Sequence, residues 1–180
     1  MPGMRTMDNP QVTERDLIWL ACFIDCEGTI QLVRPTAESG NAMYYHTRIS
    51  TAITDARMVE EVQQILRKLG CNPYIHEYLP SKGKRGNAKN AYHITLQRFS
   101  HVKRVLEAIL PYLILKDAQA RLLLDFIALR TDNGTHSGRK KKGFGDAEHG
   151  IWQRVRSLNA RGTSQTARAA SLNGDPAERG

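Results

Sequence analysis

Residues 20–28 read Leu20-Ala21-Cys22-Phe23-Ile24-Asp25-Cys26-Glu27-Gly28, and this stretch is the most informative part of the 180-residue chain. Apolar and small residues lead directly into two acidic residues, and a glycine follows them. Carboxylates are unfavourable at the C-terminal end of a helix, because the free carbonyl groups there carry partial negative charge. A positive group should therefore offset Asp25 and Glu27, and a divalent metal ion is the best candidate.

The residues before this stretch predict the helix that carries it. Thr13 offers an N-cap side chain, and Glu14 and Asp16 place negative charge in the first turn, where the helix dipole favours it. One apolar stripe follows at helical spacing, formed by Leu17, Leu20, Ala21 and Ile24. A second stripe is small or polar, and it comprises Ile18, Cys22, Asp25 and Cys26. Small residues would let another helix approach closely, and Gly28 ends the helix.

After Gly28 the pattern changes to alternation, which predicts β-strands. Two hairpins are expected, with strands at 29–33, 44–53, 74–79 and 91–97. Helices follow each hairpin, at about 54–69, 100–110 and 117–130. The predicted fold class is therefore α+β, with an α-β-β-α-β-β-α core, a four-stranded antiparallel sheet backed by helices, and a C-terminal helix and tail.

The chain divides by composition into three parts. Residues 1–12 read as a flexible N-terminal arm, and residues 13–130 as the folded core. Residues 131–180 form a basic C-terminal region, with a Gly-, Ser- and Lys-rich loop, a short helix around Ile151–Leu158 and a tail. We expect the tail to be partly disordered, or to become ordered only on binding.

Charge and cysteine content narrow the possible environments. The net charge of +8 and a pI of about 9.6 favour a polyanionic partner such as nucleic acid. Three cysteines within apolar patterns predict a reducing intracellular compartment, either cytoplasm or an organelle. Cys22 and Cys26 could form half of a zinc site, but no second pair completes it. No apolar run is long enough to span a membrane, so no membrane partner is expected.

On a helix that runs into a hairpin, residues 20–28 resemble the nine-residue LAGLIDADG signature of a family of DNA-cutting homing endonucleases. The resemblance covers roughly residues 14–130, with a weaker likeness around 151–161. The single copy of the motif is similar to the branch of the family that works as homodimers. In that branch two motif helices pack side by side across the dimer axis, and their last acidic residues bind Mg²⁺ beneath the DNA.

The resemblance implies roles for individual residues. Glu27, at the eighth motif position, becomes the catalytic ligand of Mg²⁺ (or Mn²⁺), and Cys26 contributes only its backbone carbonyl. Lys116 matches an active-site lysine that follows a Pro-containing apolar segment. Arg57 matches a basic residue one turn into the second helix, although the amide that the family commonly has just before it is missing or displaced here. The dimer interface would comprise Ala21, Cys22, Asp25 and Cys26.

The sheet is expected to bind double-stranded DNA, because a twisted antiparallel ribbon fits the major groove. Side chains assigned to its outward rows are Gln31, Arg34, Tyr44, His46, Arg48, Ser50, His76, Tyr78, His93 and Thr95. Basic residues assigned to phosphates are Lys82, Lys84, Arg85 and Lys89 on the second hairpin, and Arg154 and Arg161 near the C-terminus.

The resemblance thus implies a site-specific double-strand DNA endonuclease, intron-encoded and Mg²⁺-dependent, that acts as a homodimer. One alternative is a maturase that binds its host intron RNA. Another is a DNA-binding regulator that kept the fold and lost catalysis, and a third treats the motif only as a dimer seam. Glu27 and Lys116 favour the nuclease, because a regulator has no need for an acidic group facing phosphates.

Overall fold

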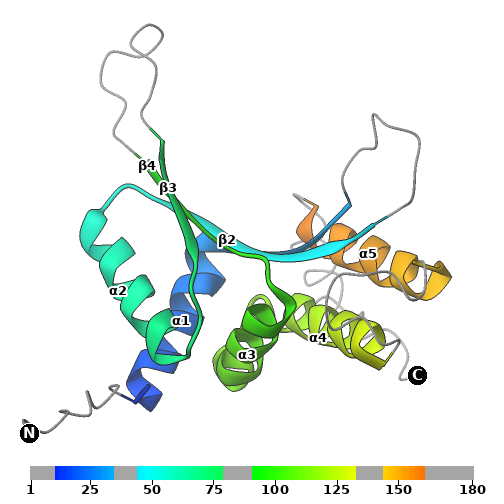
Figure 1. Ribbon diagram of the computed structural model, residues 1–180, viewed down its shortest axis with the longest axis horizontal. Coiled ribbons are helices and arrows are strands. Elements are labelled where there is room, and N and C mark those ends of the chain that lie inside the picture. The colour runs from blue at the N-terminus through cyan, green and yellow to red at the C-terminus, as the bar shows by residue number, and fades with distance from the viewer. Residues whose placement is uncertain (1–10, 35–43, 79–90, 133–143, 161–180) are drawn as a thin grey trace, which may run out of the picture.

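The computed structural model describes residues 11–34, 44–78, 91–132 and 144–160, and it has one four-stranded antiparallel sheet with helices packed beneath it (Figure 1). Its elements are α1 (Glu14–Glu27), β1 (Gly28–Val33), β2 (His46–Ile53), α2 (Ala56–Lys68), β3 (Tyr74–Tyr78), β4 (Ala91–Leu96), α3 (Phe99–Ile109), the 3₁₀ turn η1 (Leu110–Tyr112), α4 (Asp117–Asp132) and α5 (Asp146–Asn159). The strand order is β1-β2-β4-β3. The α+β fold with two hairpins in one sheet is confirmed.

Local signals in the sequence set the ends of the first two helices. Thr13 caps α1 by accepting the Asp16 N–H (3.2 Å), and the Asp16 carboxylate accepts the Thr13 N–H (3.0 Å) in return. Asp55 caps α2 through the Arg57 N–H (2.9 Å). After α2, Gly70 has a φ of 68°, a left-handed conformation that favours glycine.

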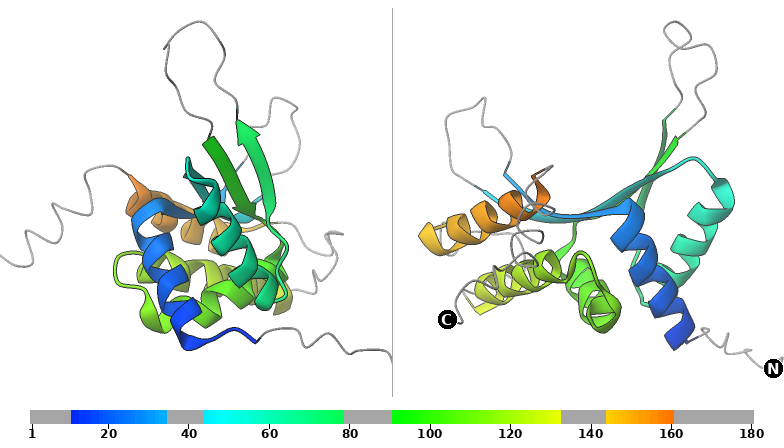
Figure 2. Two further views of the ribbon diagram at one scale, coloured as in Figure 1. Left: turned by 90° about the vertical axis from the view of Figure 1, so that its left-hand side faces the viewer. Right: turned by 180° about the vertical axis from the view of Figure 1, so that it is seen from behind.

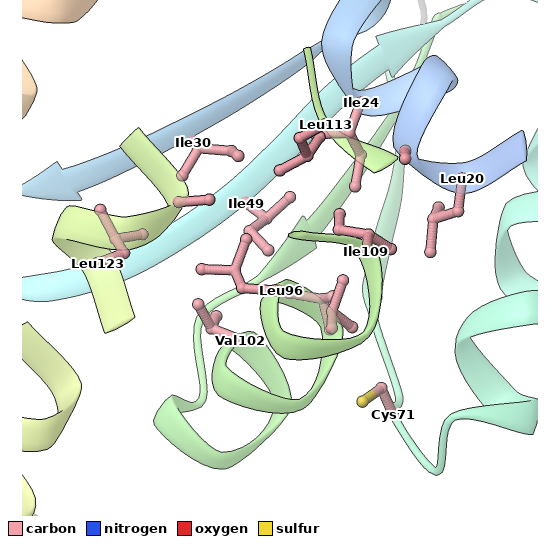
Figure 3. Close-up of a cluster of buried hydrophobic side chains, with 14 of the residues drawn as sticks. Leu20, Ile24, Ile30, Ile49, Cys71, Leu96, Val102, Ile109, Leu113 and Leu123 are labelled. Carbon is pink, nitrogen blue, oxygen red and sulfur yellow. The ribbon is translucent and has the colours of Figure 1, made fainter. Parts of the chain in front are cut away.

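The core lies between the sheet and the helices (Figure 3). Leu20 and Ile24 of α1 point into it from one end, and Ile109 and Leu123 contribute from α3 and α4. Ile30, Ile49 and Leu96 come from the sheet face that the helices cover. This packing fixes α1 against the sheet, so that the end of α1 is a rigid point. None of the helices in the described segments is long and apolar enough to cross a membrane.

The C-terminal helix α5 is longer than the sequence predicts, because it begins at Asp146 rather than near Ile151. Glu148 explains the early start. Its buried carboxylate accepts the Gly145 N–H (2.9 Å) and a hydrogen bond from Arg130 (3.1 Å). Burial alone would raise the pKa of Glu148, but these hydrogen bonds and the Arg130 charge lower it overall.

Helix α5 is part of the main core rather than an appendage. It packs along α4 and the edge strand β1 (Figure 2). Val155 is fully buried there, and the Asn159 side-chain amide donates to the Ile30 carbonyl (2.8 Å). This hydrogen bond satisfies a backbone group on β1, which is an edge strand of the sheet formed by the described residues.

The junction between α1 and β1 requires glycine at position 28. A Cβ atom there would lie 2.8 Å from the Ile24 carbonyl oxygen and 2.9 Å from the Ile24 Cα. Both atoms belong to the backbone of α1, so the clash can be relieved only by moving the end of the helix. The helix can therefore pass directly into the strand only because residue 28 has no side chain.

We predict that Gly28→Ala lowers the free energy of unfolding by about 1–3 kcal/mol, since the added methyl group displaces the Ile24 backbone. Gly150→Ala is the matched control. No atom lies within 4 Å of a Cβ built at Gly150, and alanine in the middle of α5 should stabilise the protein by roughly 0.5–1 kcal/mol. Urea denaturation of both variants measures the difference, and equal stabilities would contradict the tight junction.

Candidate active site and nucleic-acid interface

The sheet face away from the helices carries a continuous set of polar and aromatic side chains. Strand alternation puts Tyr45, Thr47 and Ile49 in the core, so their neighbours in β2 point outward. Cross-strand pairing then places these neighbours beside outward residues of the other strands. The pairs are Gln31 with Arg48, Ser50 with Thr95, Thr95 with Tyr74, and His93 with His76.

Several side chains of this outer face are ordered by contacts with one another. Arg48 lies 3.3 Å from His46 Nε2, and within the described part of the chain its buried Nε has no hydrogen-bond partner. Burial and the Arg48 charge lower the pKa of His46. Tyr44 stacks on His46, and its side chain stays half exposed. The face therefore presents an exposed aromatic ring, Tyr44, beside the ordered His46 and Arg48 side chains.

Arg34, expected in the outward rows, lies elsewhere. Val33 is the last residue of β1 on the outer face, so alternation turns the next side chain toward the helices. The Arg34 guanidinium lies over the Trp152 ring of α5, 5.5 Å from its centre. Arg156 approaches the same ring at 5.3 Å. The structure thus assigns Arg34 to the α5 edge.

The basic residues expected at phosphates are only partly described. Lys82, Lys84, Arg85, Lys89 and Arg161 lie outside the described residues. Arg154 is exposed on α5. Tyr78 is exposed at the end of β3, on the same face as His76.

Glu27 and Lys116 come together at the C-terminal end of α1. Glu27 is the last residue of the helix, and its side chain is exposed. The Lys116 ammonium donates to the carbonyl oxygens of Ile24 (3.0 Å) and Asp25. Burial lowers the pKa of Lys116, while the nearby Asp25 and Glu27 charges act in the opposite direction. The Lys116 ammonium thus lies at the C-terminal end of α1, where the sequence predicts a positive group.

Asp25 holds the segment that carries this lysine. Its carboxylate accepts the backbone N–H groups of Ile114 (2.6 Å), Leu115 (3.1 Å) and Lys116 (2.9 Å). Asp25 is only 6% exposed, and Ala21 is fully buried. Ala21 and Asp25, expected at an interface between protomers, thus face the interior of their own protomer. Residues 114–116 of the same chain occupy that side of α1, so a second protomer cannot contact it there.

The outward side of α1 is apolar and lacks a cover among the described residues. Cys22 and Cys26 are exposed free thiols, and Ile18 is 49% exposed. Ile114 and Leu115 lie beside the end of α1 and are 75% and 51% exposed. We call these five residues the α1 patch. Ile114 and Leu115 could have been noticed in the sequence as part of the apolar run Leu113-Ile114-Leu115. Of these three residues Leu113 is buried and the other two are exposed.

Arg57, expected at the active site, is held by the N-cap residue of its own helix, Asp55. Its guanidinium makes two hydrogen bonds to Asp55, at 3.2 and 2.7 Å, and its side chain is 90% exposed. Hydrogen bonds from the Arg57 side chain and backbone hold the pKa of Asp55 at about 2. Arg57 is thus oriented at the start of α2 by its own helix cap.

The residues at the end of α1 fit a divalent ion that also has ligands from outside the chain. No group of three or more His, Cys, Asp and Glu side chains in the described segments could hold a metal alone. Glu27 offers one exposed carboxylate, and the Cys26 carbonyl adjoins it. Mg²⁺ usually takes one or two carboxylates and completes its shell with phosphates and water. The donor set therefore suits Mg²⁺ when phosphate is present.

A family model for the LAGLIDADG-like domain matches residues 14–110, from the start of α1 to the end of α3. The chain belongs to the LAGLIDADG-like domain family. Its fold is similar to that of I-CvuI in a DNA complex with Mg, at 20% identity and a TM-score of 0.53, covering 93% of this chain and 89% of that one. A search of curated protein sequences returned no match.

Two further homing endonucleases share the fold of this LAGLIDADG-like domain. I-TnaI matches at 14% identity and a TM-score of 0.54, over 87% of this chain and 96% of that one. I-SmaMI bound to cleaved DNA matches at 14% identity and a TM-score of 0.56, over 85% of this chain but only 47% of that one. These likenesses establish the fold.

We predict that Asp25→Asn lowers the free energy of unfolding by about 2–3 kcal/mol, because asparagine cannot accept all three backbone N–H groups. Asp125→Asn, at an exposed position of α4, is the control and should change stability by less than about 0.5 kcal/mol. Chemical denaturation compares the two variants. If they are equally stable, Asp25 does not hold the 114–116 segment.

Proposed function

We propose that this LAGLIDADG-like chain is a site-specific double-strand DNA endonuclease that acts as a homodimer and uses Mg²⁺ (or Mn²⁺). The observation that carries the proposal is that Lys116, bound to the last carbonyls of α1, lies near the exposed Glu27 where α1 passes into the sheet. An acidic ligand and a fixed cation thus stand at the end of the outer face. This is the arrangement that a phosphate group in a groove-bound duplex requires.

The chemistry follows from the needs of phosphodiester hydrolysis. Glu27, with the Cys26 carbonyl, would hold the divalent ion, which when bound activates water and stabilises charge on the phosphate and leaving oxygen. Lys116 would place its ammonium beside the scissile phosphate and offset negative charge. Its hydrogen bonds to α1 carbonyls fix that charge in advance, so little reorganisation is needed during reaction. Arg57 would contact the DNA from the start of α2.

Dimerisation would supply what one chain lacks. Each chain has one Glu27, whereas cutting two strands needs one such corner for each strand. The α1 patch is an exposed apolar surface around Cys22 and Cys26, and a second copy of the chain is its proposed occupant. The length of I-SmaMI supports a dimer. The match covers only 47% of that longer chain, so two copies of this chain would be needed to reach a similar size. A symmetric dimer implies a pseudo-palindromic DNA site.

The outer face of the sheet would read the bases. Gln31 and Arg48 are paired across β1 and β2, and both side chains can form specific hydrogen bonds in the major groove. The remaining outward contacts would come from Tyr44, His46, Ser50, His76, Tyr78, His93 and Thr95. The DNA complexes of I-CvuI and I-SmaMI support a duplex partner. Basic residues on α5 such as Arg154 would contact phosphates, which makes binding depend on salt.

A non-cutting DNA-binding regulator is the main rival. It would use the same sheet but have no use for an exposed carboxylate near a lysine. In a regulator the Glu27–Lys116 corner would have no role in function, whereas an endonuclease needs both groups. Loss of Mg²⁺-dependent cutting on removal of the Glu27 charge therefore separates the two functions.

We predict that Glu27→Gln abolishes Mg²⁺-dependent cleavage and leaves duplex binding unchanged or stronger, because it removes the ligand charge and keeps the shape. The assay selects cut products from a randomised DNA library with and without Mg²⁺, then measures cutting and affinity on the selected site. Glu107→Gln, at an exposed position of α3, is the matched control and should retain activity. Retained cutting by Glu27→Gln, or a loss confined to binding, would contradict the role of Glu27.

We predict that Cys22→Leu weakens the dimer at least tenfold, because extra side-chain volume separates helices that pack through small residues. Ala128→Leu, at an exposed position of α4, adds similar bulk away from the α1 patch and should leave the dimer intact. Analytical ultracentrifugation over a concentration series gives both dissociation constants. An unchanged dimer in the Cys22 variant would place the interface elsewhere.

A further inference from the structure

A polar hollow lies at the opposite edge of the sheet from Glu27. It measures about 390 Å³, within the range of small-molecule sites, which is roughly 300–1,000 Å³. It opens where β3 begins, β4 ends and α3 starts, and it is lined by Asn72, Tyr74, Thr95, Gln97, Arg98 and His101. In the strand order β1-β2-β4-β3 the hollow is lined by residues of β3 and β4, and β2 lies between them and β1, which follows Glu27 directly. This hollow is therefore distinct from the corner at the end of α1.

One wall of the hollow is an exposed aromatic ring. The Tyr74 side chain is 69% exposed, although it belongs to a paired strand. It stacks almost parallel to His76, with ring centres 6.4 Å apart and planes 9° apart. The two rings are nearly parallel because residues two apart on a strand point to the same side of the sheet. A flat and exposed ring provides a surface on which a planar ligand can stack.

The Arg98 side of the lining is positively charged. Within the described part of the chain, no hydrogen bond or ion pair engages the Arg98 guanidinium. The pKa of His101 is lowered by burial and by the positive charges of Arg98 and Arg104. The hollow therefore favours an anionic group at this wall. The other lining residues, Asn72, Gln97 and Thr95, supply donors and acceptors.

Both walls are anchored to the core. Thr47 donates to the Gln97 carbonyl (3.2 Å), which fixes the end of β4. The buried Cys71 thiol approaches the carbonyl of His101 (3.7 Å) and so links the segment before β3 to α3. Arg104 donates to the carbonyls of Leu69 (3.1 Å) and Gly70 (3.3 Å) across the same junction. These contacts fix the backbone around the hollow in place.

We propose that this hollow binds one unpaired nucleotide of a DNA strand, with its base stacked on Tyr74 and its phosphate at Arg98. The base must be unpaired, because in a duplex both of its faces are covered by neighbouring bases. The hollow is continuous with the outer face, since Tyr74 pairs with Thr95 and Thr95 with Ser50. The inference rests on the proposed DNA partner, and it adds a single-strand subsite to it.

The test measures fluorescence anisotropy with a labelled deoxyadenylate of about twelve nucleotides and with an abasic strand of equal length, in EDTA and without duplex. Wild-type protein should bind the base-containing strand about tenfold more tightly. Tyr74→Leu should remove that preference and leave abasic binding unchanged, whereas Tyr74→Phe should keep it. Arg98→Gln should weaken binding of both strands and reduce the salt slope by about 0.7.

The following outcomes would overturn the proposal. Equal wild-type affinity for the two strands excludes base stacking, and so does an unchanged preference in Tyr74→Leu. If Tyr74→Leu weakens binding of a fully paired duplex by the same factor, Tyr74 is a groove contact. Binding of an RNA strand alone would exclude DNA as the ligand. Failure here is distinguishable from failure of the endonuclease proposal, because the Glu27→Gln cleavage assay uses duplex and Mg²⁺.

Discussion

The rest of the site depends on the contact between Asp25 and the backbone of residues 114–116. Three N–H groups converge on one buried carboxylate, and the lysine at the end of that segment returns to the carbonyl end of α1. The two sets of hydrogen bonds are complementary. The Asp25 carboxylate accepts from backbone N–H groups of residues 114–116, and the Lys116 ammonium donates to backbone carbonyls of α1. The unfavourable charge at the end of the motif helix is thereby offset, and Glu27 can remain exposed.

This contact also shows how far the sequence predicts the site. Periodicity places Asp25 and Glu27 at the end of a helix and states that a positive group is needed there. It cannot name the group, since Ile114 is 89 residues away from Asp25. Lys116 was identifiable only through resemblance to a family. The sequence favoured a metal ion as the positive group, and in the structure Lys116 already occupies part of that role.

Other differences between expectation and structure have equally local causes. Glu148 starts α5 early because it meets Arg130, a partner that local composition in a Gly- and Lys-rich stretch does not reveal. Arg34 leaves the outer rows because it falls one residue past the last outward position of β1. By contrast, the strands and the cap at Thr13 were predictable, since each depends only on neighbouring residues.

The two sides of α1 explain why cysteines are tolerated in the motif. The inner side is filled by Leu20, Ala21 and Ile24 and by the Asp25 hydrogen bonds, so its geometry does not depend on a partner. The outer side needs only small residues. Cysteine is small enough for close helix packing and is apolar when buried, so Cys22 and Cys26 can replace smaller residues without disturbing the Asp25–Lys116 exchange. Under the proposed function, the corner that cuts DNA is thus fixed within one chain, and the dimer contact only sets the distance between two such corners.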